Sequence, residues 1–316
     1  MRLAILCSVL SFAGVWSWLS AAAAKDAATP SDVAEKISKA APEKATAAPA
    51  QKRKVLAFTK ALGFKHGSIP VCAKMVEVLG SKTGAWETVT SDDMAMFEPE
   101  TLRQFDAVFM CSTTGDLFGR DPLDKAPKAE AERFARLRKS VLDFVSGGKG
   151  WGGSHAATDS CYGWPEYGEM IGGYFSGHPY GKIFVKIDDT ASPINAAFKG
   201  QGFEFADEMY VFGPRGKKVD GKDSQPYSRE KLHVLLSIDS ANEKVKINPA
   251  AGKRDDADYA ISWVKSYGKG RVFYCSFGHN DRIFFDPRIL QHFQDGIQFM
   301  LGDLKADTTP SAKPGK

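Results

Sequence analysis

A glycine-rich segment that ends in a histidine constrains the fold of this chain more than any other feature. Residues 146–160 read SGGKGWGGSHAATDS and follow an apolar helical pattern. Gly147 and Gly148 are suited to end that helix, and residues 150–154 are suited to a crowded central strand. In an open α/β sheet, ligands collect at the carboxyl ends of the strands, so His155 is a candidate functional residue.

The first residues have the features of a secretory signal peptide. Arg2 precedes an apolar run over residues 3–19, and a series of alanines follows. We therefore expect residues 1–24 to be cleaved and the protein to be exported to the periplasm or the extracellular space. An uncleaved membrane anchor is the alternative, and no later segment of the sequence is long and apolar enough to span a bilayer.

Composition divides the remaining chain into a core and two polar flanks. Residues 25–52 are mostly Ala, Lys, Pro, Glu, Ser and Thr, which predicts a disordered linker. Residues 53–304 have ample apolar content for one large α/β domain, and residues 305–316 are typical of a disordered tail. Basic and acidic residues are interspersed at a net charge of +4, which argues against a nucleic-acid-binding face.

The cysteines leave their redox state open. Cys111 and Cys275 lie in apolar, strand-like runs that favour buried, reduced thiols. An exported compartment permits disulfides among Cys72, Cys111, Cys161 and Cys275, but a domain of this size does not depend on them. Neither the disulfide state nor the oligomeric state follows from the sequence.

Short apolar runs alternate with amphipathic helical patterns in the first half of the core. The expected strands are residues 54–59, 86–90, 107–112 and 150–154, and the expected helices are residues 66–79, 99–105 and a long helix that ends near residue 146. This alternation predicts an α/β fold with a doubly wound, mostly parallel sheet and helices on both faces.

The second half of the core is less regular. Strand-like segments with polar connections, typical of mixed or antiparallel additions, occupy residues 183–187, 232–238 and 259–264. A buried strand follows at residues 271–277, and Asp286 and Pro287 have the residue types that begin a last helix.

Polar side chains follow four of the expected strands. His66 follows the first strand, and the others are followed by residues 112–116, by His155 to Asp159, and by residues 279–281, which begin with His279. Because the carboxyl ends of parallel strands meet at one edge of a sheet, we expect these groups to converge. Two residues of the irregular half belong with them. His178 lies between a glycine and a proline. Glu208 lies among apolar residues, which can raise its pKa and suit it as an acid or base.

Imidazoles and carboxylates are also the ligands of zinc and similar divalent ions. His155 and Asp159 are four residues apart and could share one face of a helix, so His155, Asp159 and His178 are candidate metal ligands. The chain lacks a tight metal signature such as HExxH. It also lacks an evident nucleophile, because His155 stands where the serine of a G-x-S-x-G elbow would be.

Five motifs, in order, resemble the ThuA-like (trehalose utilisation) family: GFKHGSI, GGKGWGGSHAATDS, GYFSGHP, FADEMYVF and YGKGRVFYCSFGH. The resemblance runs from about Lys54 to Leu304 and implies the class I glutamine amidotransferase-like, flavodoxin-like fold. Amidotransferases carry a catalytic cysteine at the turn that corresponds to His155 and a catalytic histidine that His279 resembles. Cys161 lies too late in the chain to replace that cysteine, so glutaminase chemistry is not expected.

The resemblance implies the processing of a sugar, such as an oxidised (3-keto) glycoside, with a divalent metal such as zinc as a cofactor in related members. The partner is then a small-molecule carbohydrate. The residues given catalytic weight are His155, His279 and Glu208, and the candidate substrate-binding residues are His66, His178, Asp159, Trp151 and Tyr210. The chain is expected to be an enzyme, and two alternatives remain: a non-catalytic carbohydrate-binding or scaffold protein, and a metal-dependent hydrolase of a non-sugar substrate.

Overall fold

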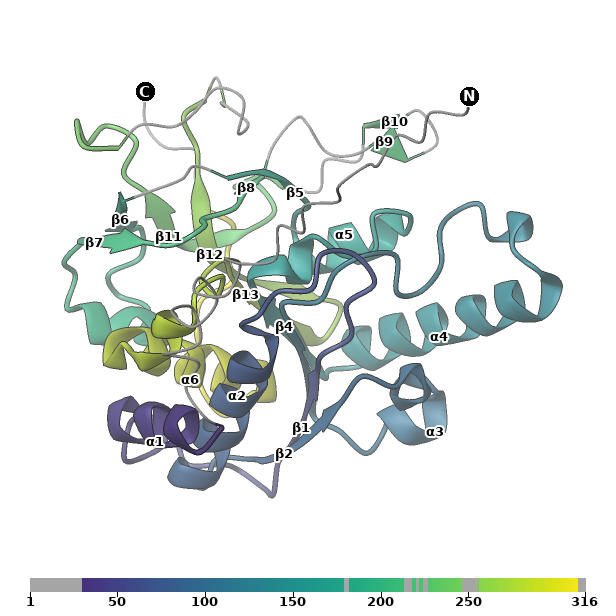
Figure 1. Cartoon of the computed structure of the whole chain (residues 1–316), viewed down its shortest axis with the longest axis horizontal. Coiled ribbons are helices and arrows are strands. Elements are labelled where there is room, and N and C mark those ends of the chain that lie inside the picture. The colour runs from purple at the N-terminus through teal and green to yellow at the C-terminus, as the bar shows by residue number, and fades with distance from the viewer. Residues whose placement is uncertain are drawn as a thin grey trace, which may run out of the picture.

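The computed structural model describes residues 30–178, 182–212, 218–219, 222–223, 227–245, 254 and 256–311. The predicted signal peptide lies outside these residues. The helices are α1 (Pro30–Ala40), α2 (Ile69–Thr83), α3 (Pro99–Leu102), α4 (Lys128–Ser146), α5 (Pro165–Ile171) and α6 (Pro287–Leu301). The strands are β1 (Lys54–Phe58), β2 (Glu87–Ser91), β3 (Ala107–Cys111), β4 (Gly150–Ser154), β5 (Phe175–Gly177), β6 (Lys182–Ile187), β7 (Phe203–Ala206), β8 (Val211–Phe212), β9 (Lys218–Val219), β10 (Lys222–Asp223), β11 (His233–Ile238), β12 (Ala260–Tyr267) and β13 (Gly270–Cys275) (Figure 1).

A large sheet organises the described part of the chain. Its strands follow the order β2-β1-β3-β4-β13-β12-β11-β6-β7. The strands from β2 to β13 pair in parallel, and those from β13 to β7 pair antiparallel. This arrangement confirms the predicted mostly parallel α/β sheet with antiparallel additions in the second half.

Helices cover both faces of the parallel part (Figure 1). Alternate residues of β1 point to opposite faces, so that Val55 and Ala57 join one hydrophobic cluster while Leu56 and Phe58 join the other. The first cluster includes buried residues of α1, α2 and α6, and the second includes those of α4 and α5. Buried, apolar residues on both sides are the pattern expected of a parallel sheet between two helical layers.

The glycines of β4 leave room for the backbone and side chains that pack closely against this central strand. A Cβ atom on Gly152 would lie 2.2 Å from the carbonyl oxygen of Phe273 and 2.7 Å from the sulfur of Met300. A Cβ atom on Gly153 would lie 2.6 Å from the carbonyl oxygen of Met110. Strand β4 lies between β3 and β13, so its contacts with both neighbours and with α6 require glycine at these positions.

The predicted linker over residues 25–52 is wrong for the residues that the structure describes. Residues 30–40 form α1, whose Val33 and Ile37 are buried against the core. Further along, the backbone N–H of Thr46 donates to the side chain of Gln298 on α6 at 2.9 Å. Two apolar residues four positions apart gave α1 a face to bury, although the composition around them is polar.

The predicted disordered tail over residues 305–316 is likewise wrong for residues 305–311. The N–H of Ser311 donates to the carbonyl oxygen of Leu232 at 2.9 Å, and the N–H of Val234 donates to the Ser311 hydroxyl at 2.9 Å. Strand β11 pairs with β6 only over residues 236–238, so its first residues leave backbone groups unpaired toward that side. The tail supplies partners for them, which the polar sequence of the tail does not indicate.

The C-terminal end of α4 and the N-terminal end of α6 follow the sequence prediction. Gly147 is the residue after the last turn of α4, and Asp286 caps α6 by accepting a hydrogen bond from the N–H of Arg288 at 2.9 Å. Over the described residues, no helix combines the length and the apolar character that crossing a bilayer requires.

Candidate functional site

His155 is held at a tight turn at the carboxyl end of β4. Its φ of 45° lies in the left-handed region, which a residue with a side chain rarely adopts, and its side chain is fully buried. The Nδ1 atom lies 3.1 Å from the carbonyl oxygen of Ser276. A carbonyl oxygen only accepts, so Nδ1 carries a hydrogen, and Nε2 is the nitrogen that faces Glu208 in the site.

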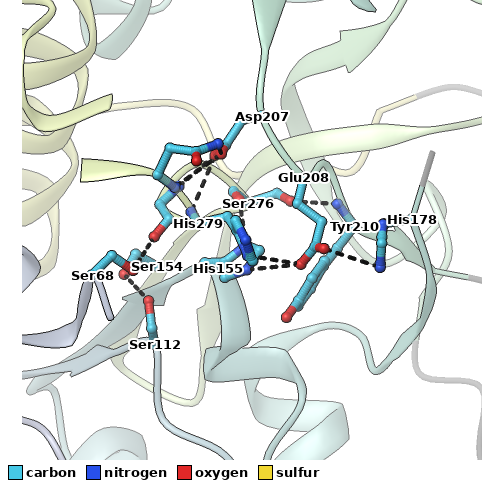
Figure 2. Close-up of polar contacts among 12 residues, drawn as sticks. Ser68, Ser112, Ser154, His155, His178, Asp207, Glu208, Tyr210, Ser276 and His279 are labelled. Atoms are coloured by element: carbon cyan, nitrogen blue, oxygen red, sulfur yellow. Dashed lines mark hydrogen bonds and ion pairs between the residues drawn. The ribbon is translucent and has the colours of Figure 1, made fainter. Parts of the chain in front are cut away.

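Glu208 lies at the centre of the site. Its Oε2 atom is 3.0 Å from Nδ1 of His279 and 3.4 Å from Nε2 of His155, and its Oε1 atom is 3.1 Å from Nε2 of His178. Figure 2 shows the carboxylate between His155 on one side and His178 on the other. Glu208 follows β7, whereas His279 follows β13, so the contact joins the antiparallel and parallel parts of the sheet.

His66 completes the group from the loop between β1 and α2. Its ring centroid lies 4.8 Å from that of His155 and 5.5 Å from that of His279. Burial, and after it the neighbouring imidazoles of His155 and His279, lower the pKa of His66 to about 3. At neutral pH, His66 is therefore an uncharged imidazole with a lone pair available.

The pKa of Glu208 is lowered, contrary to the raised pKa that its apolar sequence neighbours predict, and it reflects two opposing causes. Burial disfavours its ionised form, but the surrounding imidazoles of His155, His178 and His279 outweigh burial and hold the pKa of the carboxyl below its usual range. Glu208 is therefore a carboxylate at neutral pH. A carboxylate oxygen beside imidazole nitrogens is a donor set that binds divalent cations.

Asp207 holds the loop that carries His279. Its carboxylate accepts hydrogen bonds from the backbone N–H groups of Gly278, His279 and Asn280 at 3.0, 3.2 and 3.1 Å. The side chain of Asn280 donates to the same carboxylate at 2.7 Å. Figure 2 shows Asp207 turned toward this loop and away from Glu208, its neighbour in the chain.

Ser276 and Ser68 make further contacts with the same loop. The Ser276 hydroxyl accepts a hydrogen bond from the N–H of Tyr210 at 2.7 Å, while its carbonyl oxygen accepts from His155. The Ser68 hydroxyl donates to the carbonyl oxygen of Gly278 at 2.6 Å. Three chain segments are thus fastened to the end of β13, and the positions of the functional side chains depend on one another.

The donor atoms of four side chains fit a divalent ion. One ligand atom from each of His66, His155, Glu208 and His279 lies within 4.8 Å of all the others. Ligand atoms around a first-row ion lie about 3 to 4.3 Å apart, given bonds of about 2.0 to 2.2 Å, so an inward movement of less than about 1 Å is enough. Imidazole nitrogen with one carboxylate oxygen suits zinc and similar ions.

The hydrogen bonding of the buried nitrogens agrees with that fit. Among the described residues, Nε2 of His155, Nδ1 of His66 and Nδ1 of His279 have no hydrogen-bond partner. Nδ1 of His279 lies 3.0 Å from Glu208 without the geometry of a hydrogen bond. Buried polar atoms are normally hydrogen-bonded, so buried nitrogens that converge on one carboxylate oxygen without hydrogen bonds indicate a ligand site.

The structure brings together most of the predicted site residues. His66, His155, His279 and Glu208 form the four-residue cluster, and His178 contacts it through the second oxygen of Glu208. Tyr210 also contacts the site, but as a buried residue. Its ring lies 4.2 Å from that of His155 and 4.1 Å from that of Phe175, and only 2% of its surface is exposed, which leaves little of the ring for a sugar.

Two predicted site residues lie elsewhere. Trp151 is fully buried in the core, 6.1 Å from the ring of Phe97 and 6.2 Å from that of Tyr167, so its predicted stacking on a sugar is wrong. Asp159 does not belong to the four-residue cluster, and its carboxylate accepts a hydrogen bond from the Tyr162 hydroxyl at 2.7 Å.

Of the predicted metal ligands His155, Asp159 and His178, only His155 belongs to the four-residue cluster. The expected face of an α-helix does not exist, because His155–Thr158 forms a 3-10 turn and Asp159 follows it. A spacing of four residues does not align side chains at three residues per turn. His66, His279 and Glu208 are the other members of the cluster.

The sequence reasoning missed Asp207 and Ser276 as supporting residues. Asp207 was visible as the first of two adjacent acids, and Ser276 as a hydroxyl between the buried strand and Gly278. Neither sequence pattern shows which backbone groups these two side chains contact, because those groups lie about 70 residues away along the chain.

The four cysteines within the described residues, Cys72, Cys111, Cys161 and Cys275, are free and buried. Burial raises the pKa of the Cys161 thiol well above its usual range and that of Cys275 to about 12. A buried thiol with a raised pKa is a poor nucleophile, which agrees with the expectation that no cysteine replaces the one missing at position 155.

Comparisons with known proteins identify the family. The model of the trehalose utilisation (ThuA) family matches residues 54–300. A ThuA-like protein from Bacteroides uniformis has a similar structure, with a TM-score of 0.59 and 20% sequence identity, over 84% of this chain and 98% of that chain. One from Parabacteroides merdae matches with a TM-score of 0.54 and 15% identity, over 82% and 93%.

The search of curated proteins found no match. The family model spans nearly the whole described core, including the turn at His155 and the loop at His279. The chain therefore belongs to the trehalose utilisation (ThuA) family.

Proposed function

We propose that this protein is an enzyme that processes a sugar, such as an oxidised (3-keto) glycoside, with a divalent ion such as zinc in its histidine and glutamate cluster. The observation that carries the proposal is the convergence of four ligand atoms within 4.8 Å, with buried nitrogens that have no hydrogen-bond partner among the described residues. The description of the family as one of trehalose utilisation supports a sugar as the substrate.

In this proposal, His66, His155, His279 and Oε2 of Glu208 hold the ion. When bound, a divalent ion polarises a carbonyl or hydroxyl oxygen and stabilises negative charge on it. The chain contributes a proton-transfer pair beside the ion, because Oε1 of Glu208 lies 3.1 Å from Nε2 of His178. A keto group acidifies the hydrogens on its neighbouring carbons, and a carboxylate and imidazole in contact can accept and return such a proton.

Metal content tests the first half of the proposal. Wild-type protein prepared without chelators is expected to contain about one divalent ion per chain by inductively coupled plasma mass spectrometry, and His155→Ala is expected to contain little. His233→Gln is the matched control, because His233 pairs with Asp189 at 2.9 Å, away from the cluster. Equal metal content in wild type and His155→Ala, or no metal and no response to added zinc, contradicts the metal site.

Turnover tests the second half. Trehalose, its 3-keto derivative and other ordinary and oxidised disaccharides are incubated with the protein, and products are followed by mass spectrometry. Turnover that is lost in His155→Ala and Glu208→Gln supports the proposal. Sugar binding without turnover indicates a carbohydrate-binding or scaffold protein. Non-sugar esters and amides are assayed in parallel, and turnover of these alone indicates a metal-dependent hydrolase.

We also propose export, on the basis of the apolar segment and alanine series in residues 1–24. Expression of the full chain and sequencing of the mature N-terminus test this proposal. A mature protein that begins near residue 25 is the expected result, and an intact N-terminus contradicts cleavage.

A further inference from the structure

Two apolar side chains stand out on the surface of the described residues. Leu62 and Phe64 are the large hydrophobic residues that are exposed there, at 60% and 67% of their surface. They lie two positions apart in the loop between β1 and α2, directly before His66. Single exposed hydrophobic residues are common, but a pair beside a candidate site suggests a binding surface.

The loop that carries this pair is held firmly by the segment after β3. The N–H of Leu62 donates to the carbonyl oxygen of Thr114 at 2.9 Å, and the N–H of Gly63 donates to the Thr114 hydroxyl at 3.1 Å. The same hydroxyl donates to the carbonyl oxygen of Phe64 at 3.0 Å. The backbone is therefore fixed on both sides of Gly63, and the exposure of the two side chains is a property of the folded loop.

Gly115 allows the close approach of the two segments. A Cβ atom at Gly115 would lie 2.9 Å from Cβ of Leu62, and its φ of 84° lies in the left-handed region. The structure thus accommodates the loop at a position where only glycine fits without strain.

Phe64 is continuous with the cluster through His66. The ring of Phe64 meets that of His66 edge to face at 4.7 Å, and the ring of His66 meets that of His155 edge to face at 4.8 Å. An aromatic ring one step beyond His66 is in position to contact the part of a substrate that does not react.

We propose that Phe64, with Leu62 beside it, binds the outer, non-reacting ring of a two-ring glycoside by stacking on its apolar face. The inference rests on the proposed function and specifies its substrate as a disaccharide or a larger glycoside. Each face of a pyranose ring that carries axial C–H groups is apolar, and an exposed aromatic ring on a fixed backbone binds it with little loss of conformational entropy.

The test compares one-ring and two-ring sugars in binding by isothermal titration calorimetry. The probes are trehalose and 3-keto-trehalose, with glucose and 3-keto-glucose as their one-ring counterparts. Phe64→Ala is expected to weaken binding of the two-ring sugars by about tenfold and to leave binding of the one-ring sugars within about twofold. Phe64→Trp is expected to restore the binding of the two-ring sugars.

Phe144→Ala is the control, because Phe144 is a partly buried phenylalanine on α4, next to the opposite end of β4. It is expected to bind all four sugars as wild type does. If wild type binds the sugars and Phe64→Ala weakens the binding of one-ring and two-ring sugars equally, or of neither, the role of Phe64 is overturned. The proposed function then still stands. Wild type that binds no sugar overturns both. Light scattering gives a further outcome: a wild type that self-associates and a Phe64→Ala variant that is monomeric would assign the pair to self-association and also overturn the inference.

Discussion

At the scale of single residues, Asp207 holds the loop that carries His279. Its carboxylate accepts hydrogen bonds from three consecutive backbone N–H groups and from one side-chain amide in this loop. Its carboxylate does not join the four ligand atoms of the cluster. Such a residue acts on the site through the groups that it orients, as residues behind metal ligands commonly do.

Replacement of Asp207 by alanine separates this role from general stability. Asp207→Ala is expected to lower zinc affinity by about 10- to 100-fold and to destabilise the protein by about 2 kcal/mol or more, because buried donors lose their acceptor. Competition with a chelator measures the affinity, and urea denaturation measures the stability.

Asp189→Ala is the matched control for this variant. Asp189 also holds a loop, by accepting from the N–H groups of Ala191 and Ser192 at 2.9 and 3.0 Å, but it is not part of the cluster. We expect it to lose stability and keep its zinc affinity. Equal affinities in the two variants would show that Asp207 has no positioning role.

At the scale of elements, the glycines of strand β4 are both visible in the sequence and required by the close packing around the strand. The glycine run predicted a crowded strand, and the structure shows that Gly152 faces the backbone of β13 and Met300 of α6. Gly152→Ala is expected to destabilise the fold by about 1 to 3 kcal/mol, because the neighbouring backbone must move.

Gly67 provides the control for this substitution, since a Cβ atom there would meet nothing within 4 Å. Gly67→Ala is expected to change the midpoint of urea denaturation little. A Gly152→Ala protein as stable as Gly67→Ala would mean that α6 and β13 accommodate the methyl group easily.

The packing of the N-terminal segment on α6 includes a buried acid. The Thr46 hydroxyl donates to the carboxyl of Asp295, and burial raises the pKa of that carboxyl to about 7. The folded state therefore retains a proton that the unfolded state releases above about pH 4, so this group makes the protein less stable as pH rises from about 4 to 7.

The variant Asp295→Asn removes that dependence. Relative to the variant, wild type is expected to lose of the order of 1.4 kcal/mol per pH unit between pH 4 and pH 7, and to change no further above pH 7. Urea denaturation of both proteins at pH 4.5, 6 and 7.5 measures the difference. A constant difference across this range would rule out titration of Asp295.

At the scale of the whole molecule, buried histidines act in the opposite direction. Burial lowers the pKa of His292 to about 4, and His66 is lowered to about 3. Because the unfolded chain binds protons near pH 6.5 and the folded chain does not, stability contributed by these groups falls as pH falls from about 6.5 to 4.

His292→Gln isolates one of these groups, because His292 contacts Ser262 and Ile194 in the core and lies apart from the cluster. The stability of wild type relative to this variant is expected to rise with pH from about 4 to 6.5 and then level off. The same denaturation series as for Asp295→Asn gives the measurement. Parallel curves for wild type and variant would indicate that His292 has an ordinary pKa.

The sequence predicted the order of the elements well because local patterns determine them. Apolar runs, helical spacing and the capping residues at Gly147 and Asp286 depend on neighbours in the chain, and each matched an observed element. The two flanks were predicted wrongly because their order depends on distant partners. Thr46 is held by Gln298, and Ser311 is held by Leu232.

The sequence by itself determined the parallel sheet, the turn that presents His155, and the strand ends that carry His66 and His279. Only the tertiary structure decided which carboxylate joins them. Asp159 is near His155 in the chain, but a 3-10 turn carries it away from the cluster, whereas Glu208 arrives from the antiparallel part of the sheet, 53 positions later. Local spacing fixes the direction of a side chain within an element, and the packing of separate elements fixes which side chains meet.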